Sequence, residues 1–94
     1  MRTHPLQVTA VRFVPASPFD QRRGLVGYIR LCLGGVEVDG VTLRRSRDGR
    51  RLLSFPSRRD AEGRSHPYLR FDDRTRRSIE QQVFAAIGLQ EART

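Results

Sequence analysis

The sequence predicts a small, single-domain α+β protein, with an antiparallel sheet of four to five strands over about residues 6–71 and one C-terminal α-helix over about residues 73–87. Short apolar runs separated by turn residues fill most of the chain, whereas an apolar pattern of helical period comes only at its end. The length suits one domain, 1–94, with a thin core. A hydrophobic content of 37% with 30% charged residues is typical of soluble globular proteins.

The first predicted strand, 6–14, changes phase along its length. Alternate residues from Leu6 to Ala10 fall on one face, whereas Val11 and Phe13 fall on the other. This change predicts either a β-bulge near Ala10 or a strand covered on both faces.

A long connection, Pro15–Gly24, follows, and its two prolines predict that it stays out of the sheet.

The best strand pattern of the chain is Leu25–Leu33, and Gly34–Gly35 is a strong signal for a two-residue hairpin turn. The next strand, Val36–Arg45, slips in phase at Asp39–Gly40, which predicts a bulge. The residues of the best strand expected to face inward are Leu25, Ile29, Leu31 and Leu33, with Tyr28 and Arg30 on the opposite face.

A tight turn at Ser46–Gly49 leads to the fourth predicted strand, Arg51–Phe55. The turn and its flanks place five arginines at one end of a hairpin: Arg44, Arg45, Arg47, Arg50 and Arg51. A solvated turn can have this composition, but the density of the cluster favours an anion-binding surface.

The stretch Leu52–Phe71 predicts a long β-hairpin with arms at Leu52–Phe55 and Tyr68–Phe71. Pro56 marks a strand end or edge because proline cannot donate to a sheet ladder. The turn chemistry of Asp60 and Gly63 lies between the arms. The expected tip of this hairpin carries Arg58, Arg59 and Arg64.

The predicted C-terminal helix is capped by Asp72 or Asp73 and ends at Gly88. Its buried stripe consists of Ile79, Val83, Ala86 and Ile87, and its opposite face carries Arg74, Arg77 and Gln81. Arginines in the first turns run against the helix dipole, so this end is either an ordinary solvated face or a phosphate site formed with the free amides.

The net charge of +8 comes from 18 basic residues, all of them arginine, against ten acidic ones. A GC-rich genome can produce this bias without any function. The planar fork of arginine nevertheless suits phosphate and guanine, so we expect a polyanionic partner. Nucleic acid is favoured over a membrane because no amphipathic basic helix with aromatic edges is present and no apolar run could span a bilayer.

The sequence predicts no catalytic group, metal, cofactor or small-molecule substrate, and therefore no enzyme. His66 precedes Pro67 in a hairpin arm, and neither it nor His4 has an evident partner for acid–base chemistry. Cys32 is the single cysteine; we interpret it as a small buried or interface residue. A lone cysteine, with no signal-peptide pattern, predicts a cytoplasmic protein.

Five short segments occur in a distinctive order: Val8-Thr9-Ala10-Val11-Arg12, Phe55-Pro56-Ser57-Arg58-Arg59, Gly63, His66-Pro67 and Thr75-Arg76-Arg77-Ser78-Ile79. This order resembles the SpoVG family (stage V sporulation protein G, or septation regulator) from about Val8 to Ile87. The sequence departs from the family pattern in its longer Pro15–Gly24 connection, its extended Tyr68–Asp73 link and a few extra N-terminal residues.

The resemblance implies a small dimeric bacterial α+β protein that regulates by binding DNA, and also RNA, with the basic residues after Pro-Ser and at the helix start as contacts. On that basis, and from the arginine clusters, the expected nucleic-acid-binding residues are Arg58, Arg59, Arg74, Arg76, Arg77, Arg47 and Arg51. The alternative is a protein-interaction module that docks on an acidic partner without binding nucleic acid.

A homodimer is also expected from the single helix, which can cover only one face of the sheet. The other face is predicted to carry Tyr28, Cys32 and part of the Val36–Leu43 set, which is a large apolar surface for a small monomer to expose.

Overall fold

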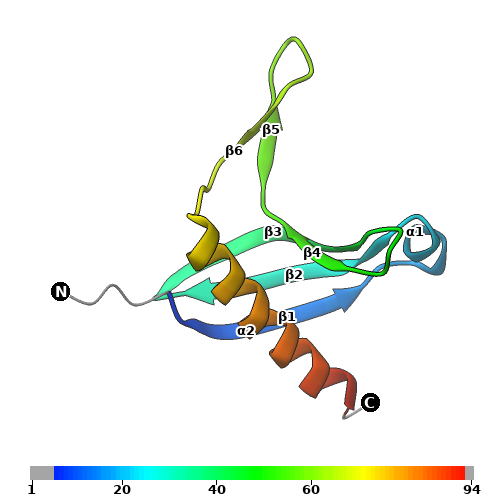
Figure 1. The fold of residues 1–94 in the computed structure, drawn as a ribbon, viewed down its shortest axis with the longest axis vertical. Coiled ribbons are helices and arrows are strands. Elements are labelled where there is room, and N and C mark those ends of the chain that lie inside the picture. Colours follow the sequence, from blue (N-terminus) through cyan, green and yellow to red (C-terminus); the bar gives the residue numbers. More distant parts are fainter. Residues whose placement is uncertain (1–5, 93–94) are drawn as a thin grey trace.

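The computed structural model describes residues 6–92, whose chain forms a four-stranded antiparallel sheet, a separate two-stranded ribbon and a helix that crosses one face of the sheet (Figure 1). The order of strands in the larger sheet is β1-β2-β3-β4, and β5 pairs only with β6. The fold class is therefore the predicted one, α+β in a single small domain. The elements are β1 (Val8–Pro15), α1 (Pro18–Arg22), β2 (Leu25–Leu33), β3 (Val36–Arg45), β4 (Arg51–Ser54), β5 (Ser57–Arg59), β6 (Ser65–Pro67) and α2 (Asp73–Ala92).

Both predicted bulges are present and keep apolar residues on the helix-covered face. The register between β1 and β2 shifts between Val8 and Ala10, after which Val11 and Phe13 pack against the core. In β3, the pairing jumps from Val41 opposite Ile29 to Val38 opposite Leu31. At this second bulge Asp39 and Gly40 together lie opposite the single residue Arg30, and Gly40 has a positive φ of 79° that glycine adopts readily.

The predicted turn at Gly34–Gly35 joins β2 to β3, with positive φ at both glycines. Of the predicted inward residues of β2, Ile29, Leu31 and Leu33 are buried. Leu25 is only partly buried, because a register shift between Leu25 and Gly27 breaks the alternation and Val26 packs against the core instead.

The prediction that the Pro15–Gly24 connection stays out of the sheet is wrong at its first residue. Pro15 is the last residue of β1, an edge strand that tolerates the missing amide donor. The short helix α1 then begins at Pro18, and the side chain of Ser17 accepts a 3.2 Å hydrogen bond from the amide of Asp20. A serine cap before proline at the first helical position favours this turn of helix.

The long hairpin was also predicted with the wrong arms. β4 pairs only with β3, and Tyr68–Phe71 is a link without a strand. The chain leaves the sheet at Pro56, so the hairpin is made by β5 and β6 and projects away from the domain (Figure 1). We call residues 57–67 the arm. Of the apolar residues of the link, Phe71 packs against the core and against the ring of Phe55 at a centroid distance of 5.2 Å, whereas Tyr68 and Leu69 are exposed.

Helix α2 begins after Asp72, whose Oδ1 accepts a 2.7 Å hydrogen bond from the amide of Thr75. The predicted stripe is confirmed: Ile79, Val83 and Ile87 are completely buried, and Ala86 is partly buried. The predicted end at Gly88 is wrong. A glycine ends a helix when it turns to a left-handed φ, and Gly88 does not, so the helix continues to Ala92.

Candidate nucleic-acid interface

The arm presents arginines on both of its faces. Arg58 pairs with His66 and Arg59 pairs with Ser65 across the ribbon. Because side chains alternate along a strand, Arg58 shares one face with His66, and Arg59 shares the other with Ser57 and Ser65. The two serine hydroxyls on that second face are joined by a 3.0 Å hydrogen bond.

Asp60 organises the turn at the end of the arm. Its Oδ1 accepts hydrogen bonds from the amides of Glu62 and Arg64, at 3.0 and 2.9 Å. Its Oδ2 accepts a 2.7 Å hydrogen bond from Nε2 of His66, which must carry the proton because a carboxylate can only accept. The His66 bond, followed by the Arg64 amide, holds the pKa of Asp60 below its ordinary value. The turn is therefore held by one ionised side chain.

The three arginines of the arm differ in their partners. Arg64 forms ion pairs with Asp60 at 3.3 Å and with Glu62 at 3.8 Å. Among the side chains that the structure describes, those of residues 6–88, no carboxylate forms an ion pair with Arg58 or Arg59, and Arg59 donates instead to the carbonyl of Gly63 at 3.4 Å. These two arginines lie in β5 rather than at the predicted tip, and Arg64 at the tip is neutralised locally.

The helix start contains the three predicted arginines in different environments. Arg74 and Arg77 are exposed, and Nε of Arg77 donates a 3.3 Å bond to the carbonyl of Asp73 in its own helix. Arg76 reaches across to β4 and donates a 2.9 Å hydrogen bond to the carbonyl of Leu53. Part of its donor capacity is thus used to hold the helix against the edge strand.

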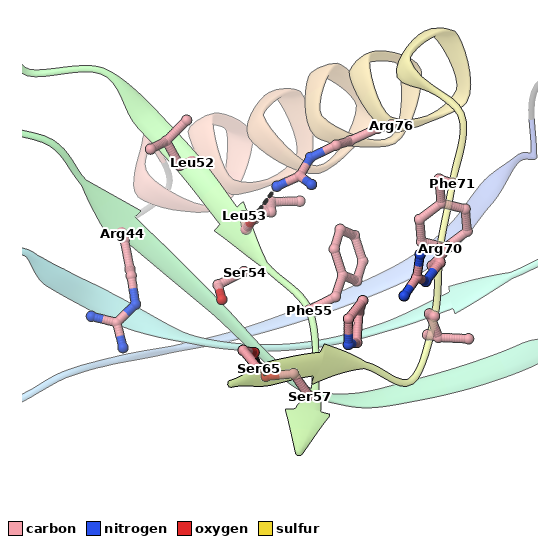
Figure 2. A pocket seen from close by; sticks show the side chains of 12 residues that line it. Arg44, Leu52, Leu53, Ser54, Phe55, Ser57, Ser65, Arg70, Phe71 and Arg76 are labelled. Carbon is pink, nitrogen blue, oxygen red and sulfur yellow. Dashed lines mark hydrogen bonds between the residues drawn. The ribbon is translucent and has the colours of Figure 1, made fainter. Parts of the chain in front are cut away.

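A cavity of about 620 Å³ lies where β4, the base of the arm and the Tyr68–Phe71 link meet. Figure 2 shows Arg44 and Arg70 on opposite sides of it, with Phe55 between them. Within the described part of the chain no carboxylate lines this cavity, whose walls are formed by Arg44, Leu52, Leu53, Ser54, Phe55, Ser57, Ser65, Pro67, Leu69, Arg70, Phe71 and Arg76. No sequence pattern placed Arg44 near Arg70, because the link was interpreted as a strand.

A second arginine cluster surrounds a smaller cavity, about 250 Å³, at the end of the sheet that holds α1. The amide of Arg45 donates to the carbonyl of Gly24 at 2.8 Å and joins the β3–β4 turn to α1. Asp48 in this turn is engaged by the hydroxyl of Ser46 and the amide of Arg50, which together lower its pKa. The arginines around the cavity are Arg22, Arg23, Arg45 and Arg47.

The predicted gathering of Arg44–Arg51 at one hairpin end is confirmed, and Arg47 and Arg51 both lie there with exposed side chains. Arg22 and Arg23 were missed. The Ser17-Pro18 capping signal could have indicated that the connection folds into a helical turn and returns them to this end of the sheet. The whole of β4 lies between this turn and the arm, so Arg47 lies before one end of β4 and Arg58 and Arg59 lie beyond the other.

The face of the sheet opposite α2 is open. Its exposed apolar residues are Val14 at 53%, Tyr28 at 48% and Leu52 at 44% of their full accessible area. On the same face Arg30 pairs with Glu37 at 3.3 Å and with Asp39 at 3.2 Å, and its hydrogen bond lowers the pKa of Asp39.

The predicted contribution of Val36–Leu43 to this open face is wrong. Val38, Val41 and Leu43 are buried under α2, because the bulge at Asp39–Gly40 restores the inward phase of β3. Cys32 is partly buried and has a free thiol.

Among residues 6–92, no helix is long and apolar enough to cross a membrane, and no three metal-ligating side chains gather in one place. Comparisons with protein-family models, with curated proteins and with solved structures found no match to the chain. The resemblance to the SpoVG family therefore stays a prediction that rests on the quoted residues.

Proposed function

We propose that the chain is a small nucleic-acid-binding regulatory protein that acts as a homodimer in the cytoplasm and contacts DNA, or RNA, through the arginines of the arm and of the start of α2. The SpoVG-like order of motifs implies the same function. Neutralisation of phosphates by guanidinium groups would supply most of the affinity, with one or two arginines reading base edges.

The contrast within the arm is the observation that supports this proposal best. Arg64 has two carboxylate partners, whereas Arg58 and Arg59 have none among residues 6–88. The two unpaired charges project from opposite faces of a ribbon that leaves the body of the protein (Figure 1). A two-stranded ribbon is narrow enough to enter the major groove of B-DNA, so the arm can meet phosphates on either side of it.

The homodimer is proposed from the open sheet face. Val14, Tyr28 and Leu52 are large apolar residues with about half of their surface exposed. Arg12 lies on the same face, opposite Arg30 in the register, and close to the acidic pair Glu37 and Asp39. A second copy placed face to face would cover the apolar residues and offer carboxylates to Arg12.

A protein-interaction module that docks an acidic partner on the same face is the alternative. The two functions differ in their response to salt. Binding of mixed-sequence DNA and RNA should weaken steeply as salt rises, because phosphate contacts release counter-ions. Fluorescence anisotropy over a salt series measures this dependence. Absence of binding to either nucleic acid at low salt would exclude the proposal and favour the interaction module.

A further inference from the structure

The cavity between β4, the base of the arm and the link has the two kinds of wall that a nucleotide needs. Its volume of about 620 Å³ lies within the range of about 300–1,000 Å³ that is usual for small-molecule sites. One part of the lining is apolar, made by Phe55, Leu69 and Phe71. Three arginines stand at separate places around this lining: Arg44 on one side, Arg70 on the opposite side and Arg76 on α2 (Figure 2).

The charges around the cavity favour an anion. Arg44 and Arg70 form no ion pair with any carboxylate of residues 6–88. Arg76 uses one terminal nitrogen for the carbonyl of Leu53, which leaves its other donors available. Hydroxyl groups of Ser54 and Ser57 add neutral hydrogen-bonding groups to the lining.

The arm leads into this cavity. Ser57 and Ser65 line the cavity, and by strand alternation they share their face of the arm with Arg59. A nucleic-acid strand whose phosphates contact Arg59 therefore reaches the cavity along the same face of the arm. A base can enter the cavity only when it is unstacked and unpaired. This requirement costs little free energy in a single strand, whereas in a duplex the base must first be extruded from its base pair.

We propose that the cavity takes one unpaired nucleotide of a single-stranded nucleic acid, with the base against the apolar wall of Phe55, Leu69 and Phe71 and the phosphate at Arg70. This inference rests on the proposed function and adds a preference for unpaired bases to it. Stacking and apolar contact would supply affinity beyond that of the phosphates, as in other single-strand binders.

Two probes separate the base from the backbone. One is an oligothymidylate of about twelve nucleotides, which does not pair with itself, and the other is an abasic strand of equal length with the same phosphates. The parent protein should bind oligothymidylate at least about fivefold more tightly than the abasic strand at matched salt, because contact with one base is worth at least that factor. Fluorescence anisotropy gives both constants.

The test variant is Leu69→Ser with Arg70→Ser, which changes one apolar and one cationic residue of the lining. The matched control is Phe19→Ser with Arg23→Ser at α1, which makes the same kind of chemical change outside both the cavity and the open sheet face. The test variant should lose the preference for bases, while the control keeps it. Arg70→Ser alone, at an exposed position, provides a second variant should the double change disturb folding, and it should weaken oligothymidylate binding more than an Arg23→Ser control does.

Each other outcome has a definite meaning. Equal affinity of the parent for both probes would overturn the inference and leave nucleic-acid binding by the backbone intact. A preference that survives in the cavity variants would also overturn it, because the base would then lie elsewhere. Displacement of the strand by free thymidine monophosphate at comparable affinity would identify a mononucleotide site instead and overturn it too. Failure to bind either probe or a mixed-sequence duplex at low salt would refute the proposed function itself.

Discussion

The guanidinium of Arg76 donates a 2.9 Å hydrogen bond to the carbonyl oxygen of Leu53, so the first turns of α2 are bonded to the edge strand β4. One turn later on the same helix face, Glu80 accepts a 3.2 Å hydrogen bond from the amide of Leu53. Both main-chain groups of this edge residue are therefore satisfied by side chains of α2.

The same helix bonds the other edge of the sheet through Gln82. Its Oε1 accepts a 2.9 Å hydrogen bond from the amide of Val8, and its Nε2 donates a 3.1 Å bond to the carbonyl of Leu6. The helix thus occupies backbone groups at both edges that would otherwise be open to pairing with another strand. This arrangement supports a dimer through the open face more than one through the strand edges.

Removal of the Arg76 hydrogen bond should destabilise the fold. Arg76→Met keeps most of the apolar stem but removes the donor to Leu53, and we expect a decrease of about 1 kcal/mol in the free energy of unfolding. Arg77→Met is the matched control, because the side chain of Arg77 bonds a carbonyl of its own helix, and it should change stability by less than about 0.5 kcal/mol. Urea unfolding followed by circular dichroism measures both. Equal midpoints for the two variants would show that the Arg76 bond does not stabilise the fold.

Truncation of the buried stripe of α2 should be more damaging. Ile79 and Val83 are completely buried, and we expect Ile79→Ala to cost about 2–4 kcal/mol and Val83→Ala somewhat less, through lost burial and a residual cavity. Gln81→Ala, at an exposed position of the same helix, is the control and should unfold almost like the parent. Near-normal melting of both truncated variants would contradict packing of α2 through this stripe.

Reversal of charge on the arm tests the proposed interface. Arg58→Glu with Arg59→Glu should weaken binding of nucleic acid by well over tenfold and flatten the salt slope by about the number of phosphates that the variant no longer neutralises. Melting should change little, because exposed arginines contribute little to stability. Affinity and salt slope are measured by anisotropy, and the melting temperature by calorimetry.

The control for the arm is Arg22→Glu with Arg23→Glu, which makes the same change in net charge at two other adjacent, exposed arginines away from the open sheet face. Its effect should be several times smaller than that of the arm variant. If the arm variant binds as tightly as the parent at matched salt, the nucleic acid binds elsewhere, with the cluster around Arg44–Arg51 as the next candidate.

The arm should lose order at low pH. The pKa of Asp60 in the folded protein lies below its ordinary value of 3.8, mainly because His66 donates to the carboxylate. The stabilisation is therefore fully present above that ordinary value and is lost as pH falls through the lower folded pKa. A carbon-detected NMR titration of the Asp60 carboxyl should give a midpoint below 3.8, accompanied by shifts of the Glu62 and Arg64 amides. A midpoint at the ordinary value would show that these bonds do not persist in solution.

Oligomeric state tests the role of the open sheet face. Light scattering at tens of micromolar protein should return the mass of a dimer, and a monomer mass would count against the proposal. Tyr28→Glu places a charge among the apolar residues of this face and should weaken dimerisation by about tenfold or more. Tyr68→Glu, at the 65% exposed tyrosine of the link, is the control and should leave the dimer unchanged.

Much of the sheet and helix could be predicted because local patterns decide them. Burial on one face specifies the strand Leu25–Leu33 and the helix that carries Ile79, Val83 and Ile87. The glycine pair after the strand specifies a turn, because both glycines have positive φ. The two bulges were visible as phase changes, since a bulge shifts alternation by one residue. Two of the errors, at Gly88 and in the Tyr68–Phe71 link, fell where the same residues suit two local conformations.

For the candidate site, the sequence predicted a set of arginines but not the partners of their side chains. Spacing along the chain was enough to place five arginines close to turns or to a helix start: Arg58, Arg59, Arg74, Arg76 and Arg77. The sequence could not reveal which of their charges are satisfied, because the carbonyl of Leu53 that binds Arg76 comes from a strand 23 residues away.

By itself, the sequence determined an arginine-rich α+β domain, the order of its first four strands along the chain and the buried face of its last helix, because these depend on alternation and helical period. Only the tertiary structure decided that the chain leaves the sheet at Pro56 to form a separate arm, and that Arg44, Arg70 and Arg76 converge on one cavity. The physical reason is that each of these features depends on how α2 and Phe71 pack against β4 and the core, a long-range contact that no local pattern records.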